Sequence, residues 1–189
     1  VMLEHQPYGQ PFYFPYILFA YLDSYPSIGT VEQYLLPEYV FLADWFDGYH
    51  SSGEINDAMP EIPITIMKPE EVQIFEENEN HILRVALQEN DLWNWTPQAP
   101  IHMFHGEGDE LVPYENSQMA YDQFVENGVE DVFLEAIPEN YGGHSDVAPW
   151  ALFGAYQVSK DIQMINELGD VNQDGDLNIL DLVMIGNII

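Results

Sequence analysis

The order strand, helix, strand is the feature of this sequence that most restricts its fold. Residues 101–105 and 132–136 are short β-prone runs, and the first is predicted to be a buried strand. Residues 114–126 between them form an amphipathic helix that Gly128 is placed to end. A closing helix is predicted over 148–166, with Leu152 and Tyr156 among its inward residues. Strands that alternate with helices pair in parallel and need cover on both faces. Because two strands alone make a poor sheet, we expect further strands from residues that precede Val1.

Two candidate catalytic side chains follow these strands. Asp109 comes after the first strand, through Gly106 and Gly108, which we expect to allow a tight turn. His144 comes after the second strand, in a glycine-rich loop. Open α/β sheets place their sites at the carboxyl ends of strands, so we predict that the carboxylate orients the imidazole. The chain has no G-x-S-x-G elbow, so a nucleophilic serine is expected outside it.

Plainer interpretations exist for each titratable residue in this region. Asp109 alone is typical of an ordinary strand-to-helix turn, and His144 alone of a surface loop, but their order and spacing together favour a pair. Asp146 is a weaker candidate for the acid. His102 and His105 lie three apart on a strand and point to opposite faces, so no shared metal is expected.

Composition excludes several classes of function. The 189 residues include 33 acidic and three basic side chains, for a formal net charge of −30, which repels nucleic acid and anionic lipid. Such a charge suits a protein in salty water, where ions screen self-repulsion. There is no cysteine, which excludes disulfides, and no apolar run of transmembrane length. At 47% hydrophobic residues, the chain can still bury a sizeable core.

The first half of the chain is predicted to be helical. Its candidate helices cover 14–22, 31–46 with an interruption near Pro37, and 70–88 with a break around 78–80. Alternation typical of strands does not occur there. The polar segment around His50 lacks the glycines of a nucleophile elbow and is predicted to be a loop.

The segments 97–115 and 132–150 resemble the C-terminal part of the α/β-hydrolase family, in its lipase, esterase and prolyl-oligopeptidase-like branches. The resemblance rests on the apolar strand with His105-Gly106, on Gly108-Asp109, on Val112-Pro113 and on Gly143-His144. It implies an α/β fold consisting of a helical cap over 1–95 and a C-terminal core over 96–167 with the last two parallel strands and their flanking helices. It also implies that Asp109 and His144 are the acid and base of a Ser-His-Asp triad.

The resemblance further implies a secreted or cell-surface serine hydrolase that cleaves carboxylic esters or lipids, present here as a fragment. A peptidase of the prolyl-oligopeptidase-like type and a non-catalytic binding module are the alternatives. The aromatic residues of the cap have two interpretations, the roof of an apolar acyl pocket or simply the core of the cap. They are Phe12, Tyr13, Phe14, Tyr16, Phe19, Tyr21, Trp45 and Phe46.

Residues 168–189 carry a second kind of signal, the ligand spacing of an EF-hand loop. Gly175 stands at the sharp turn, and hard oxygen donors that suit Ca²⁺ occupy the ligand positions. These donors are Asp170, Asn172, Asp174, Asp176, Asn178 and Asp181. The segment resembles one dockerin type I repeat, an EF-hand-like loop followed by a helix, which implies a structural Ca²⁺ and a cohesin-like or intramolecular dockerin partner.

Overall fold

The computed structural model describes residues 3–165 of the chain, so the predicted calcium loop at 168–189 lies outside the described residues. The chain divides into two compact units. One contains the residues up to Trp95 together with Glu110–Pro113, and the other contains Thr96–Asp109 and the residues from Tyr114 onward. Within residues 3–165, no helix combines the length and the apolar character needed to cross a bilayer.

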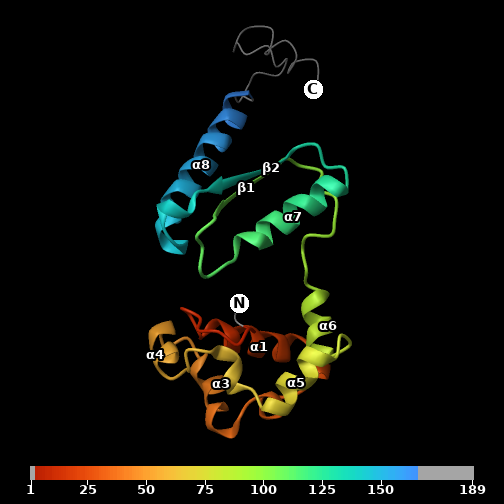
Figure 1. The fold of residues 1–189 in the computed structure, drawn as a ribbon, viewed down its shortest axis with the longest axis vertical. Coiled ribbons are helices and arrows are strands. Elements are labelled where there is room, and N and C mark those ends of the chain that lie inside the picture. The colour runs from red at the N-terminus through yellow and green to blue at the C-terminus, as the bar shows by residue number, and fades with distance from the viewer. Residues whose placement is uncertain (1–2, 166–189) are drawn as a thin grey trace, which may run out of the picture. The chain divides into compact units, whose positions relative to one another are not determined.

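The first unit is helical, as predicted, and prolines divide it into short pieces (Figure 1). Pro26, Pro37, Pro63 and Pro69 each occupy the first turn of a helical segment, where the missing N–H costs no hydrogen bond. Its elements are α1 (Tyr13–Ser24), η1 (Pro26–Ile28), α2 (Val31–Tyr34), η2 (Pro37–Tyr39), α3 (Leu42–Trp45), α4 (Ser52–Asp57), η3 (Pro63–Ile66), α5 (Pro69–Glu77) and α6 (Ile82–Gln88).

One hydrophobic core holds the helical unit together. Tyr34 at its centre is fully buried, and its hydroxyl donates a 2.6 Å hydrogen bond to the carbonyl of Ile28. Most of the predicted cap aromatics belong to this core or pack against it, while Tyr13 and Tyr16 are exposed. The most deeply buried aliphatic side chains are Leu18, Leu35, Leu42, Ile64 and Ile66. The aromatic residues are therefore mainly core, and the pocket-roof interpretation is left to the two exposed tyrosines.

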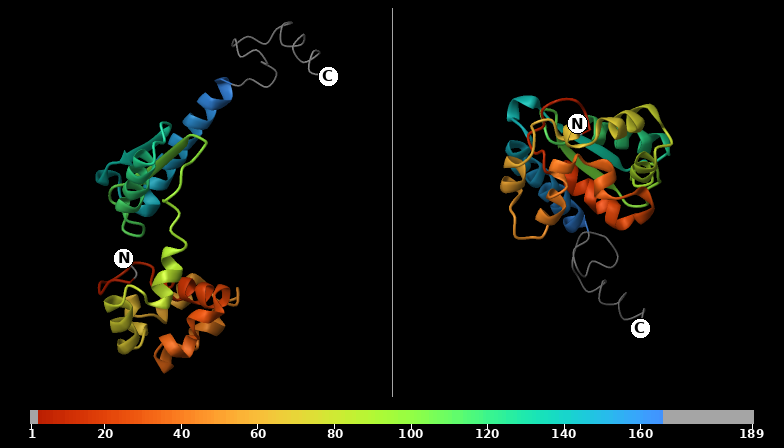
Figure 2. Two further views of the ribbon diagram at one scale, coloured as in Figure 1. Left: turned by 90° about the vertical axis from the view of Figure 1, so that its right-hand side faces the viewer. Right: turned by 90° about the horizontal axis from the view of Figure 1, so that it is seen from below.

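The second unit is a small α/β layer structure. Strands β1 (Ile101–Gly106) and β2 (Val132–Ile137) pair in parallel, as predicted, from Ile101 opposite Val132 to Gly106 opposite Ile137. Helix α7 (Tyr114–Glu126) connects them and ends before Gly128, whose φ of 80° is the left-handed conformation predicted for that glycine. A short turn η4 (Glu139–Tyr141) leads into α8 (His144–Ile165), which runs along the strands (Figures 1 and 2).

Helices α7 and α8 pack on opposite faces of the two strands. Successive β1 side chains alternate between the faces. Phe104 contacts α8 at Gly154, and Gly106 lies against Val147 of α8. His105, between them in sequence, contacts Ser117 of α7 instead. The sheet face at the end of β1 therefore presents His105 toward the helix that follows Asp109.

Three predictions for this unit are wrong. Helix α8 begins at His144, four residues before the predicted start, and contains Pro149 in its interior. Leu152 and Tyr156 are 72% and 60% exposed, because the inward stripe of α8 is at Val147 and Gly154. Strand β1, expected to be buried, is only partly buried along most of its length. Both strands have one neighbour each within the described residues, which leaves apolar surface uncovered there.

Candidate active site

The backbone around Asp109 continues the sheet and then turns sharply. Glu107 donates its N–H to the carbonyl of Ile137, and Asp109 donates its own to the carbonyl of Gly106 at 3.3 Å. The turn that we predicted after Gly106 and Gly108 is present, and neither glycine has a positive φ in it. Glycine is favoured at both positions because a side chain would have too little room. A Cβ on Gly106 would lie 3.0 Å from Val147, and one on Gly108 would lie 3.1 Å from the carbonyl oxygen of Gly142.

The backbone around His144 is a helix start rather than the loop that we predicted. Gly142 has a φ of 105°, the left-handed region in which glycine is favoured. Gly143 then precedes the helix, and its carbonyl accepts from the N–H groups of Asp146 and Val147. In return, the carboxylate of Asp146 accepts from the N–H of Gly143 at 3.2 Å. In a capping box, the side chain of the third helical residue accepts from the backbone N–H of the N-cap residue, and Asp146 does this for Gly143. His144 is therefore the first residue of α8.

Asp109 and His144 lie together, as the sequence predicted. The Nδ1 of His144 is 2.7 Å from the Oδ2 of Asp109, a charge-assisted hydrogen-bond distance. The Asp109 side chain is only 4% exposed, while that of His144 is 47% exposed. A buried carboxylate that accepts from Nδ1–H leaves Nε2 with the lone pair. The arrangement therefore orients the imidazole with Nε2 available to accept a proton, which is the geometry that general-base chemistry requires.

Asp146 has another task in the structure. Its carboxylate caps the start of α8 through Gly143, whereas the imidazole of His144 meets Asp109. The geometry therefore favours Asp109 over Asp146 as the acid. The segment after His50 is also structural, since Ser51 and Glu54 form a complete capping box at the start of α4.

One further side chain, His105, contacts this pair, and Ser117 contacts His105 in turn; sequence reasoning assigned neither contact. The Nε2 of His105 lies 3.5 Å from the same Oδ2 of Asp109, and its Nδ1 lies 2.6 Å from the Oγ of Ser117. His105 is 10% exposed. Strand alternation predicts that His105 and Phe104 face opposite sides of the sheet, but it does not say which side α7 covers.

Tyr114 completes the surroundings of His105. Its ring meets the imidazole edge-to-face, with 5.7 Å between the ring centroids. Burial, followed by the charges of Glu107 and Asp122, raises the pKa of Tyr114 above its ordinary value. Its hydroxyl therefore stays protonated at neutral pH and remains a hydrogen-bond donor, directed to the side chain of Gln118.

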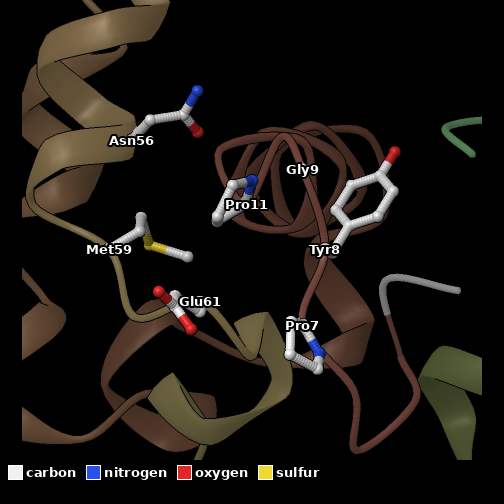
Figure 3. Close-up of a pocket in the computed structure, with 7 residues that line it drawn as sticks. All are labelled: Pro7, Tyr8, Gly9, Pro11, Asn56, Met59 and Glu61. Carbon is white, nitrogen blue, oxygen red and sulfur yellow. The ribbon is translucent and has the colours of Figure 1, made fainter.

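The helical unit contains a groove of its own, of about 450 Å³. In Figure 3, residues 7–9 and Pro11 line one side of it, and Asn56, Met59 and Glu61 line the other. The amide of Asn56 is engaged on both atoms, since it accepts from the N–H of Phe12 and donates to the side chain of Gln10. Asn56 therefore holds the wall of the groove in place.

No group of three or more His, Asp or Glu side chains within residues 3–165 is arranged to hold a metal ion. The six predicted calcium ligands, from Asp170 to Asp181, lie outside the described part of the chain, and their oxygen donors suit Ca²⁺ by chemistry alone.

Comparison with known proteins places part of the chain near a family of lipases. Residues 64–150 match the secretory lipase family, a range that includes both Asp109 and His144. No curated protein matches the chain. The match ends before the calcium-binding repeat, which stays a prediction.

Two solved structures share the fold. A hydrolase from Legionella pneumophila superposes with a TM-score of 0.69 at 22% identity, over 83% of this chain and 46% of its own. The rice cell wall degrading esterase LipA from Xanthomonas oryzae superposes with a TM-score of 0.60 at 25% identity, over 78% of this chain and 39% of its own. The chain thus spans less than half the length of these proteins. Over residues 64–150 it is similar to the secretory lipases, and its fold is consistent with part of an α/β-hydrolase.

Proposed function

We propose that this chain is the acid-and-base portion of a secreted, ester-cleaving serine hydrolase. The nucleophilic serine and the oxyanion hole would be supplied by residues that precede Val1 in a longer protein. His144 would take the proton of the serine hydroxyl and return it to the leaving alcohol, and Asp109 would orient the imidazole and stabilise its charged form.

The observation that carries the proposal is the 2.7 Å contact between Nδ1 of His144 and the buried Oδ2 of Asp109. Two paired strands and a capped helix hold these groups, so the tautomer needed for general-base chemistry is set before substrate binds. The absence of a G-x-S-x-G motif from the 189 residues, and the short share of the solved hydrolases that the chain spans, support an upstream serine.

Esters are favoured over peptides as the substrate class because the matched family consists of lipases and a solved relative is an esterase. The oriented imidazole would serve either chemistry, so the distinction rests on these similarities. A secreted location rests on the same family match. Parallel assays on p-nitrophenyl esters and on a proline-containing peptide amide distinguish the two substrate classes.

Activity measurements on two proteins test the proposal. The 189-residue chain alone should not turn over a p-nitrophenyl ester, whereas the longer protein that includes the preceding residues should. Turnover by the isolated chain would show that the nucleophile is not upstream. A longer protein that folds, lacks a G-x-S-x-G serine and shows no turnover would indicate a non-catalytic binding module.

The identity of the acid is tested by two matched substitutions in the longer protein. Asp109→Asn keeps the shape of the side chain but offers His144 the wrong hydrogen-bonding partner, and we expect kcat to fall by about 10⁴-fold. Asp146→Asn retains an oxygen that can cap Gly143 and should keep most of the activity. Equal losses in the two variants would contradict the assignment of Asp109.

We also propose that residues 168–189 bind one structural Ca²⁺ through a dockerin-like loop, with a cohesin-like or second dockerin repeat as partner. Support comes from the spacing of the oxygen donors Asp170 to Asp181 around Gly175. Calorimetric titration of the 189-residue chain at about 0.15 M salt, where weak surface binding is screened, should show a site that Asp174→Ala removes. Asp131→Ala is the control, and equal heats in both variants would dismiss the loop as the site.

A further inference from the structure

We propose that Ser117 and His105 are positioning residues for Asp109, in which Ser117 fixes the tautomer of His105 so that its Nε2–H faces the carboxylate. The contact itself is independent of the reaction, while its catalytic meaning rests on the function proposed above. The three side chains come from the sheet, the turn that follows it and the first turn of α7.

The distances define an ordered chain of contacts. Ser117 Oγ lies 2.6 Å from Nδ1 of His105, and Nε2 on the other side of the same ring lies 3.5 Å from Oδ2 of Asp109. The second contact is at the outer limit of hydrogen-bond distance and acts mainly through charge. Both His105 and Asp109 are nine-tenths or more buried, so this charge acts in surroundings that screen it little.

Only one tautomer of His105 satisfies both neighbours. A serine hydroxyl can donate or accept, but an ionised carboxylate can only accept. If Ser117 donates to Nδ1, the proton of the ring lies on Nε2 and points to Asp109. In the opposite tautomer, the lone pair of Nε2 would face the carboxylate, and the two acceptors would repel each other. The carboxylate therefore favours the Nε2–H form, and Ser117 stabilises that form by donating to Nδ1 at 2.6 Å.

The consequence for the site is a carboxylate held from two sides. Oδ2 of Asp109 lies 2.7 Å from Nδ1 of His144 and 3.5 Å from Nε2 of His105. Tyr114 closes His105 in from the α7 side with its ring. A buried acid with one partner can rotate away when that partner moves, whereas a second partner keeps it aimed at His144 as the imidazole exchanges protons.

Imidazole ¹H–¹⁵N spectra of the 189-residue chain test the proposal without any need for activity. At about pH 8, where imidazoles are mostly neutral, His105 should be in the Nε2–H form. Ser117→Ala should shift its tautomer ratio toward Nδ1–H by about two- to tenfold, the effect of one hydrogen bond. Ser117→Thr, which keeps the hydroxyl, should preserve the ratio. Ser159→Ala, on the exposed side of α8, is the control.

Two results would overturn the proposal. The first is a His105 ring in the Nδ1–H form in the unmodified protein, or one that does not respond to Ser117→Ala more than to Ser159→Ala. The second result concerns the coupling of His105 to Asp109. His105→Phe should lower the Nδ1–H fraction of His144. An unchanged fraction would show that His105 does not position the acid. His105→Gln replaces His105→Phe if the latter fails to fold, as judged by circular dichroism.

The effect of Ser117 on catalysis is tested in the longer protein. Ser117→Ala should lower kcat several-fold with KM unchanged, and Ser117→Thr should restore it, because the positioning of the acid affects the proton transfer and not the binding of substrate. A longer protein without esterase activity would remove the proposed function and leave the spectroscopic result standing. Normal kcat in Ser117→Ala would remove the catalytic role of the contact.

Discussion

Gly154 sets how closely α8 approaches the sheet, since a Cβ at this position would lie 2.4 Å from the ring of Phe104. We expect Gly154→Ala to destabilise the α/β unit by about 1–3 kcal/mol, because the added methyl must push the helix or the ring from its place. Urea unfolding followed by circular dichroism measures the loss.

A control and a rescue accompany this substitution. Gly53→Ala lies in α4 with its nearest neighbour 3.9 Å from the added Cβ, so it should be neutral or stabilising. Phe104→Leu combined with Gly154→Ala should recover part of the loss, since the smaller side chain makes room. If Gly154→Ala and Gly53→Ala have the same free energy of unfolding, α8 does not approach β1 as closely as described.

At the same scale, the sequence could predict that Asp109 and His144 meet, but not which residues support them. Asp109 and His144 each follow a β-prone run, and parallel strands bring their carboxyl ends to one edge. The contact of His105 with Ser117 depends instead on which face of β1 the helix α7 covers, a property that sequence spacing alone does not contain. The roles of Gly106 and Gly108 also depend on neighbours distant in sequence, namely Val147 and Gly142.

Among the elements, most helices and both strands follow from periodicity and from proline and glycine positions. Helix α8 shows the limit of such rules. Pro149 favours a helix that starts just before it, yet Gly143 and Asp146 cap the helix earlier and the proline is accommodated inside. Its inward face was also mispredicted, since small residues such as Gly154 pack on the sheet while Leu152 is exposed.

The pairing of the helical elements depends on Tyr34, which joins α2 to η1 through its bond to Ile28. Burial, followed by the charge of Glu71, raises the pKa of Tyr34 in the folded state. The unfolded state therefore loses this proton first as pH rises. The contribution of Tyr34 to stability is present below about pH 10 and falls as pH rises above it.

Thermal unfolding between about pH 8 and pH 11 tests this pH dependence. Tyr34→Phe should lower the melting temperature at pH 8, because the carbonyl of Ile28 loses its donor. Above about pH 10, the melting temperature of this variant should fall less steeply with pH than that of the unmodified protein. Tyr16→Phe, at an exposed position on α1, is the matched control and should leave both unchanged. An equally steep decline in Tyr34→Phe and in the unmodified protein would assign the effect to other groups.

For the whole molecule, the balance of charge is the dominant property. The net charge is −30, and two of the three basic side chains hold backbone groups. Lys68 donates to the carbonyl of Glu32, and Arg84 donates to the carbonyls of Phe75 and Glu76 while it lies over the Phe75 ring. These contacts join helical elements but remove little of the repulsion among the carboxylates. Self-repulsion of this kind destabilises the folded state, and dissolved ions screen it.

We accordingly expect the melting temperature to rise steadily between about 0.05 M and 1 M sodium chloride, as the screening length falls from above 10 Å to about 3 Å. A variant with three exposed charges removed, Asp23→Asn, Glu38→Gln and Glu89→Gln, should be more stable at low salt and should respond less to added salt. This comparison separates screening from the general effect of salt on apolar burial, which the two proteins share. If the melting temperatures of both proteins rise equally with sodium chloride concentration, repulsion among the carboxylates does not limit the stability of the folded chain.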